Sequence, residues 1–187
     1  MTSWPTRDEA QAILDDWTKS VNLKKHAYAV EAAMRAYAEG LGEDAEKWGV
    51  VGLLHDFDYE KYPDAQDHPF RGVDFLRQQG RSEELIEAIL AHAEYSGVER
   101  DTPLKKMIFA VDELTGLIVA VALVRPSKKL ADVTVDSVLK KWRDRRFAAG
   151  VNRKLIEEGA KEAGVTLEDH IGTVLKAMQG IAGKLGL

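Results

Sequence analysis

The 187-residue sequence contains no cysteine and few prolines. Without cysteine the chain can form neither a disulfide framework nor a thiolate metal site. Any bound metal must therefore be held by imidazole and carboxylate groups. Such ligands suit iron, manganese, cobalt, nickel or zinc better than copper(I) or an iron–sulfur cluster.

Long apolar runs are also missing. The longest, residues 117–124, is far too short to cross a bilayer. Residues 1–5 show no basic region followed by an apolar stretch, as a signal peptide would require. We therefore expect a cytoplasmic protein with no membrane partner.

The chain has no excess of positive charge, because 26 Lys and Arg stand against 31 Asp and Glu, a net charge of -5. Surfaces that follow a nucleic-acid backbone are usually basic, so we expect no long nucleic-acid partner. A small anion held at a local cationic site remains compatible with this balance. The hydrophobic share of 45% is ordinary for a globular protein, and the length predicts one domain, residues 1–187.

The alternating pattern of half-buried strands is absent, and helical spacing of apolar residues runs through the chain. Capping residues such as Thr6, Ser82 and Thr166 indicate where helices begin. The predicted helices cover about residues 6–17, 22–40, 43–56, from 69, from 82, 102–124, 135–143, 151–163 and 167–184. Residues 117–124 alone could form a strand, but they follow a helix without a break, so we expect a buried helical segment. The sequence predicts an all-α, single-domain helical bundle.

One adjacent pair, His55-Asp56, ends an apolar helical run and is costly to bury unless both side chains have partners. A divalent metal is a common partner for a neutral imidazole beside a carboxylate. Asp112, in the middle of another apolar helix, is a second buried carboxylate that should have a cation.

Three further histidines complete an ordered series with these residues. His26 shares the apolar face of its helix, His68 precedes a proline that opens a helix, and His92 lies near the end of the next helix. His26 alone would be read as a core histidine bonded to backbone. The series is His26, His55-Asp56, His68, His92, Asp112.

Two metal ions can share this set of ligands. His26, His55, Asp56 and Asp112 can surround one ion, and Asp56 can bridge to a second ion held by His68 and His92. Two aspartates against two divalent ions leave a residual positive charge that attracts phosphate oxygens. Such a pair of ions activates water for in-line phosphoester hydrolysis without a protein nucleophile.

Other charged residues are candidates for supporting roles. Lys61, Arg125 and Lys128 are predicted to bind substrate phosphate, although each could be a surface charge. Asp56, Asp58 and Lys61 are predicted to be catalytic. Asp58 would orient water or act as a general acid, with a turn-capping role as the alternative. The loop 58–67 could be a substrate lid or a solvated connector. Glu113 is expected to face away from the metals because it lies about 100° round the helix from Asp112; His170 is placed on a polar face, outside the site.

The series resembles the HD-domain metal-dependent phosphohydrolase superfamily, whose pattern is His, then His-Asp, then a distant Asp. His68 and His92 are similar to the extra histidines of its dinuclear branch, which includes cyclic-dinucleotide and diadenosine-tetraphosphate hydrolases. The resemblance covers about residues 20–125 and implies an all-helical HD core with the six positions as ligands. The helices predicted beyond it form a C-terminal extension at about 130–187, to which no motif is assigned. The chain departs from the common His-Asp-Ile-Gly form, reading Phe57-Asp58 after the pair.

The sequence predicts a phosphohydrolase that cleaves a phosphoester of a nucleotide or other small phosphorylated substrate by metal-activated water. Two alternatives stay open. Some HD-fold proteins resemble this pattern yet use a di-iron pair to oxidise substrates with O₂. The chain could also be a non-catalytic module that binds metal or an anion, although an intact ligand set argues against that.

Overall fold

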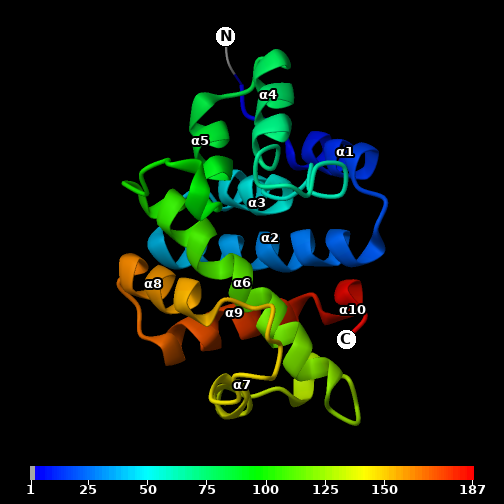
Figure 1. Ribbon diagram of the computed structural model, residues 1–187, viewed down its shortest axis with the longest axis vertical. Coiled ribbons are helices and arrows are strands. Elements are labelled where there is room, and N and C mark those ends of the chain that lie inside the picture. Colours follow the sequence, from blue (N-terminus) through cyan, green and yellow to red (C-terminus); the bar gives the residue numbers. More distant parts are fainter. Residues whose placement is uncertain (1–2) are drawn as a thin grey trace.

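Ten α-helices and two short 3-10 helices make up the regular structure of residues 3–187, the part of the chain that the computed structural model describes (Figure 1). They are α1 (Arg7–Trp17), α2 (Val21–Leu41), α3 (Ala45–Leu54), α4 (Phe70–Gln78), α5 (Glu83–Ala91), η1 (Glu94–Ser96), α6 (Pro103–Leu123), η2 (Leu130–Asp132), α7 (Val135–Trp142), α8 (Arg153–Ala163), α9 (Leu167–Gly180) and α10 (Ala182–Leu185). Apart from one isolated bridge between Ser3 and Arg81, this part of the chain contains no β-structure. The predicted all-α fold is confirmed; residues 1–2 of the predicted domain lie outside the described residues.

The helix starts predicted at Thr6, Ser82, Thr102 and Thr166 are confirmed because they depend on local capping. The predicted helix 167–184 instead divides into α9 and α10 at Ile181. The Thr6 hydroxyl accepts the Glu9 N–H, and the Glu9 carboxylate accepts the Thr6 N–H at 2.7 Å, which makes a capping box. The Ser82 and Thr102 side chains likewise cap α5 and α6. Helix α6 continues unbroken to Leu123, so the apolar run 117–124 is helical as expected.

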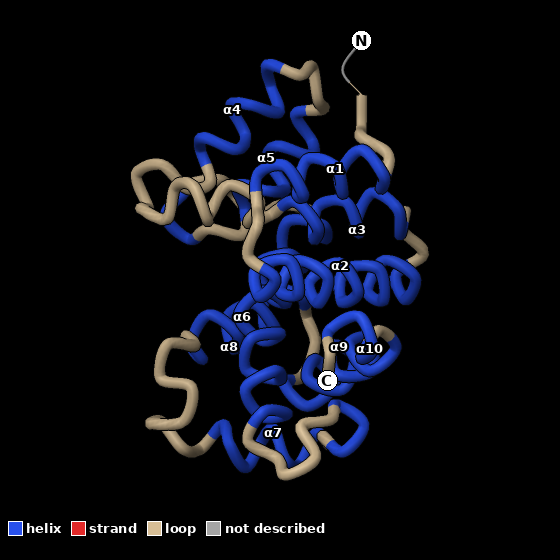
Figure 2. Tube along the Cα trace, turned by 90° about the vertical axis from the view of Figure 1, so that its right-hand side faces the viewer, coloured by secondary structure: helices blue, strands red, loops and turns tan. Residues whose placement is uncertain are grey.

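Helix α2 lies in the middle of the molecule. Helices α1, α3, α4 and α5 lie on one side of it and α7 to α10 on the other, with α6 crossing it (Figure 2). Helix α6 begins beside α5 and extends to the opposite end of the molecule (Figure 1). Both central helices are therefore shared by the two halves. Among residues 3–187, no helix combines the length and the apolar character that a membrane crossing requires.

Two glycines allow helices to approach at backbone distance. A Cβ atom added to Gly52 on α3 would lie 2.8 Å from the backbone N and Cα of Glu31 on α2. A Cβ added to Gly159 on α8 would lie 2.6 Å from the Cα of Ala110 on α6. Since real Cβ atoms do not tolerate such contacts, these positions require glycine, and the first one presses the C-terminal end of α3 against α2.

His170 corrects one expectation from the sequence. It is fully buried rather than placed on a polar face. Its Nε2–H donates to the carbonyl of Ala110 at 2.8 Å, so its Nδ1 accepts the Tyr37 hydroxyl at 2.6 Å. Burial raises the pKa of Tyr37 to about 12. This histidine links α2, α6 and α9 and stays outside the predicted site.

Candidate metal centre

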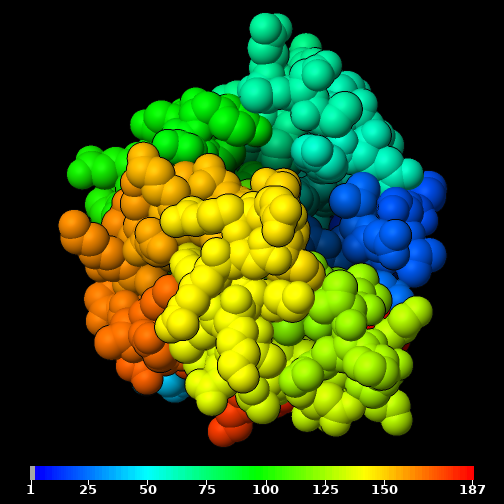
Figure 3. Space-filling view, turned by 60° about the horizontal axis from the view of Figure 1, so that its bottom comes forward, coloured from blue at the N-terminus to red at the C-terminus, as the bar shows by residue number. Residues whose placement is uncertain are grey.

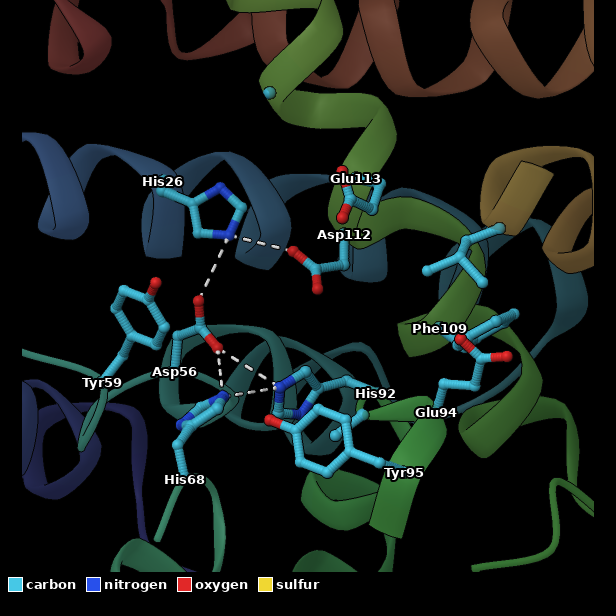
Figure 4. A pocket seen from close by; sticks show the side chains of 13 residues that line it. His26, Asp56, Tyr59, His68, His92, Glu94, Tyr95, Phe109, Asp112 and Glu113 are labelled. Carbon is cyan, nitrogen blue, oxygen red and sulfur yellow. Dashed lines mark hydrogen bonds and ion pairs between the residues drawn. The ribbon is translucent and has the colours of Figure 1, made fainter. Parts of the chain in front are cut away.

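The six predicted ligands meet at one place although they come from five segments of the chain. Figure 4 shows five of them, His26, Asp56, His68, His92 and Asp112. Their segments are α2 for His26, the end of α3 for His55 and Asp56, the segment before α4 for His68, the C-terminal cap of α5 for His92 and the middle of α6 for Asp112. The two long helices α2 and α6, the C-terminal ends of α3 and α5 and the segment before α4 thus supply all six side chains.

Three of these side chains form the first donor group, which consists of His26, His55 and Asp112. The Nε2 atoms of His26 and His55 are 3.1 Å apart. The Asp112 Oδ1 lies 3.0 Å from His26 Nε2 and 3.5 Å from His55 Nε2. The three atoms form a small triangle that faces a common centre.

The second donor group consists of Asp56, His68 and His92. The two Nε2 atoms of its histidines are 3.1 Å apart. The Asp56 Oδ1 lies 3.2 Å from His68 Nε2 and 3.3 Å from His92 Nε2. The other oxygen of Asp56, Oδ2, points to the first group, 3.5 Å from His55 Nε2 and 3.7 Å from His26 Nε2. One carboxylate therefore faces both groups.

The protonation of two histidines follows from their backbone contacts. The Nδ1–H of His55 donates to the carbonyl of Gly52 at 2.8 Å, and the Nδ1–H of His92 donates to the carbonyl of Ile89 at 2.5 Å. A neutral imidazole that is protonated on Nδ1 carries a lone pair on Nε2. Both rings therefore present a free lone pair to the centre of the site.

The other two histidines are oriented by side chains. The Thr115 hydroxyl donates to the carbonyl of Asp112 at 2.8 Å, so it accepts from His26 Nδ1 at 3.3 Å. The Asp58 Oδ1 accepts from His68 Nδ1 at 2.7 Å, while its Oδ2 accepts the Gly72 N–H at 2.8 Å. In their neutral form the four histidines would thus direct Nε2 lone pairs inward, where the lone pairs would repel one another unless a cation or a proton lay between them.

The distances fit divalent metal ions. Donors held about 2.1 Å from an ion at angles between octahedral and tetrahedral values are about 3.0–3.4 Å apart. Within each group the three separations are 3.0–3.5 Å. Lone-pair direction and donor spacing agree, so the residues present fit two ions, one for each group.

Without an ion, the neighbouring carboxylates favour the protonated form of two of the histidines. Burial lowers the pKa of His55, but the Asp56 and Asp112 carboxylates outweigh it and hold that pKa well above its usual value. Burial likewise opposes protonation of His68, yet hydrogen bonds to Asp56 and Asp58 raise its pKa to about 9. Burial acts to raise the pKa of Asp56 and of Asp112, and the neighbouring histidines reverse it, so both carboxyl pKa values lie well below the usual range.

A cavity of about 420 Å³ opens over the two groups. The surface is hollowed where the teal segment after α3, the blue surface of α1 and α2 and the yellow segment between α7 and α8 come together (Figure 3). The remaining walls come from residues around the ligands. They are Tyr59, Ala93, Glu94, Tyr95, Phe109, Glu113, Gly116 and Leu155. Among residues 3–187, neither a lysine nor an arginine lines this cavity.

The three cations predicted to bind phosphate do not reach the cavity, which corrects that part of the site. The Lys61 ammonium lies over the Trp17 ring, 4.2 Å from its centroid. Arg125 and Lys128 follow the C-terminal end of α6, and a rise of 1.5 Å per residue puts Arg125 about 20 Å along the helix from Asp112. Of residues 58–67, only Tyr59 lines the cavity, so most of the loop is a connector.

Two carboxylates also differ from expectation. Asp58 is fully buried behind His68 and does not line the cavity, so it orients the imidazole rather than substrate water. Glu113 lines the cavity instead of facing away, because its Oε2 accepts the Asn152 N–H at the start of α8. Burial and the neighbouring Asp112 raise the pKa of Glu113. The role of Thr115 in orienting His26 was not predicted from the sequence. Its position three residues after Asp112 is the signal that could have indicated this role.

The all-α fold with clustered histidine and aspartate donors defines a helical protein with two groups of side chains that could hold a metal ion. A family model described as the HD domain matches residues 23–117, about half of the chain. The chain therefore belongs to the HD-domain family, a superfamily of the metal-dependent phosphohydrolase type whose members bind divalent metals. All six proposed ligands lie within the matched residues.

Curated relatives share part of this chain. A Ribonuclease Y from Chlorobium chlorochromatii is 28% identical over 120 residues, which cover 64% of this chain and 21% of the relative. One from Oleidesulfovibrio alaskensis is 32% identical over 98 residues, covering 52% of this chain and 18% of the relative. The chain thus spans about a fifth of the length of these relatives. No solved structure matches it significantly.

Proposed function

We propose that the protein is a metal-dependent phosphohydrolase that cleaves a phosphoester bond of a nucleotide or another small phosphorylated substrate. The observation that carries this proposal is the pair of three-donor groups joined by the Asp56 carboxylate. His26, His55 and Asp112 would hold one ion, and His68 and His92 the second. Bound there, the ions would act as Lewis acids toward phosphate oxygens and lower the pKa of water.

The protein side chains have positioning roles in this proposal. The carbonyls of Gly52 and Ile89 and the side chains of Thr115 and Asp58 keep the four imidazoles in the tautomer that binds metal. The Asp56 carboxylate fixes the distance between the two groups. Because these partners sit on helix ends and packed helices, the donors are held in place before substrate arrives.

The walls of the cavity constrain the substrate. In the described part of the chain no lysine or arginine lines it, so the metal ions would supply the positive charge for the reacting phosphate. Tyr59 and Tyr95 are 40% and 52% exposed beside the ligands and offer aromatic faces to a ring such as a nucleobase. The name of the curated relatives, ribonuclease, also supports a nucleotide phosphoester. The acidic balance of this chain favours a short substrate over a long nucleic acid.

The first test is metal content and activity of protein purified without added metal. We expect close to two ions per chain and hydrolysis of p-nitrophenyl phosphate or its bis ester, lost on chelation and restored by metal. O₂ uptake is measured in parallel, because consumption of O₂ with iron bound and no phosphoester cleavage would assign the site to oxidation. Metal binding with neither activity would reduce the protein to a binding module.

A further inference from the structure

A second cavity of about 380 Å³ adjoins the metal-centre cavity. It lies between the first turns of α2, the second half of α6 and the C-terminal residues around Leu185. Two residues, His26 and Gly116, line both cavities. The two cavities therefore have two walls in common, the proposed metal ligand His26 and one position on α6.

Gly116 keeps this junction open. Glycine is the poorest helix former after proline, and a glycine inside a helix usually has a packing reason. Gly52 and Gly159 have one, since an added Cβ would meet backbone at less than 3.0 Å. A Cβ added to Gly116 would meet nothing within 4 Å. The missing side chain at Gly116 thus leaves free space between the cavities rather than room for a neighbouring helix.

The second cavity differs in chemistry from the first. Its walls are mainly apolar, from Ala29, Val119, Leu123 and Leu185. It also contains Lys25, the one lysine or arginine among the described residues that line either cavity. The Lys25 ammonium lies against Gly186, where an added Cβ would be 2.8 Å from Nζ, and it forms no ion pair with a described residue. An apolar space with an unpaired ammonium suits an apolar body that carries an anion.

We propose that the substrate lies across Gly116, with its reacting phosphate at the metal centre and its non-reacting part in the second cavity. That part has an apolar or aromatic body and a second anionic group that pairs with Lys25. The substrate class is accordingly a phosphoester with two separated anionic groups, such as a dinucleotide with a terminal phosphate. This inference rests on the proposed phosphohydrolase function and specifies its substrate.

The junction is tested by selectivity between a short and an extended substrate. We compare kcat/KM for p-nitrophenyl phosphate and for the 5′-phosphorylated dinucleotide pApA in the metal-loaded wild type, Gly116→Leu and Gly116→Ala. We expect Gly116→Leu to lower kcat/KM for pApA at least tenfold more than for p-nitrophenyl phosphate. Gly116→Ala should keep most of the wild-type preference and raise the melting temperature. Equal losses for both substrates in Gly116→Leu, or no loss, would overturn the proposal.

Lys25→Met tests the second anionic group, with Lys129→Met as the matched control. Lys129 is an exposed lysine outside both cavities. We expect Lys25→Met to raise KM for pApA about tenfold, the size of one charge-assisted hydrogen bond, and to leave KM for p-nitrophenyl phosphate within about twofold. Lys129→Met should behave as wild type. An unchanged KM for pApA in Lys25→Met contradicts the assignment of Lys25.

A binding experiment separates this inference from the proposed function. Saturation-transfer NMR with pApA and metal-free protein detects occupancy of the second cavity whether or not the protein is a hydrolase. We expect transfer to the dinucleotide in the wild type and a clear loss in both Lys25→Met and Gly116→Leu. No transfer in the wild type at millimolar pApA overturns the second cavity as a subsite, even if phosphoesters are hydrolysed.

Discussion

The His68 imidazole lies between two carboxylates, with Asp58 accepting from its Nδ1 at 2.7 Å on one edge and Asp56 Oδ1 3.2 Å from its Nε2 on the other. Asp58 is fully buried and also accepts the Gly72 N–H. It therefore fixes the ring that carries the metal donor. Partners of this kind commonly change metal affinity by 10–100-fold.

Asp58→Asn should weaken metal binding at the group of Asp56, His68 and His92. The amide has one oxygen in place of two, so it cannot accept from both His68 and Gly72. We expect metal affinity at that group to fall by about 10–100-fold, measured by competition with a chromophoric chelator. Asp64→Asn, an exposed change in the same loop, should match wild type. Equal affinity in the two variants would show that Asp58 does not position His68.

Thr115→Val should act on the other group. Valine has nearly the shape of threonine but cannot accept the His26 Nδ1–H, so the ring loses the bond that selects its tautomer. We expect roughly tenfold weaker binding at the group of His26, His55 and Asp112, with Thr115→Ser close to wild type. Metal titration of the two variants makes the measurement. A serine variant as weak as the valine variant would point to packing instead.

The number of bound ions should depend on which ligand is removed. Asp56→Ala removes the carboxylate that faces both groups, so we expect the loss of both ions. His92→Ala touches the second group alone and should retain close to one ion per chain. Metal analysis of the purified variants gives the stoichiometry. Full retention of metal in both would rule out the dinuclear arrangement.

Metal stabilisation should increase with pH. A histidine whose folded pKa is raised stabilises the fold below its unfolded pKa of about 6.5, and that contribution is lost as the pH rises through the folded pKa, about 9 for His68. The metal-free protein should therefore melt at lower temperature as pH goes from 6.5 to 9. Bound metal replaces these protons, so the gain in melting temperature on adding Mn²⁺ should grow over the same range. A gain that shrinks with pH would contradict the role of His68.

Gly52→Ala should destabilise the fold. The added methyl group would lie 2.8 Å from backbone atoms of Glu31, so α2 and α3 must separate. We expect a loss of about 1–3 kcal/mol in the free energy of unfolding, with weaker metal binding because His55 bonds to the Gly52 carbonyl. Gly40→Ala, where an added Cβ meets nothing, should stabilise by up to ~1 kcal/mol. Urea denaturation of both variants compares them.

Most helix starts and the clustering of the six candidate ligands were predictable because their signals are local. Caps such as Thr6 and Ser82 act within one turn of the chain. The ligands appear in the sequence as polar residues inside apolar helical runs, which need partners wherever the helices pack. The order of these polar residues along the chain can also be seen in the sequence alone, and it resembles the HD pattern.

The supporting residues could not be predicted, because their roles depend on distant segments. Glu113 faces the cavity through its bond to Asn152, 39 residues away in sequence. His170 is buried because Tyr37 and Ala110 satisfy both ring nitrogens. Lys25 lines the second cavity beside Gly186, which lies near the other end of the sequence. Periodicity within one helix contains none of this information.

The proposed ligands reach from residue 26 to residue 112 in a chain that has no cysteine. Ions held between α2, α3, α5 and α6 would therefore serve as reversible cross-links between segments that are far apart in sequence. A ligand that binds only the folded state stabilises it by an amount that grows with the logarithm of its free concentration. The resistance of the protein to proteases, and so its lifetime in a cell, would then follow the supply of metal.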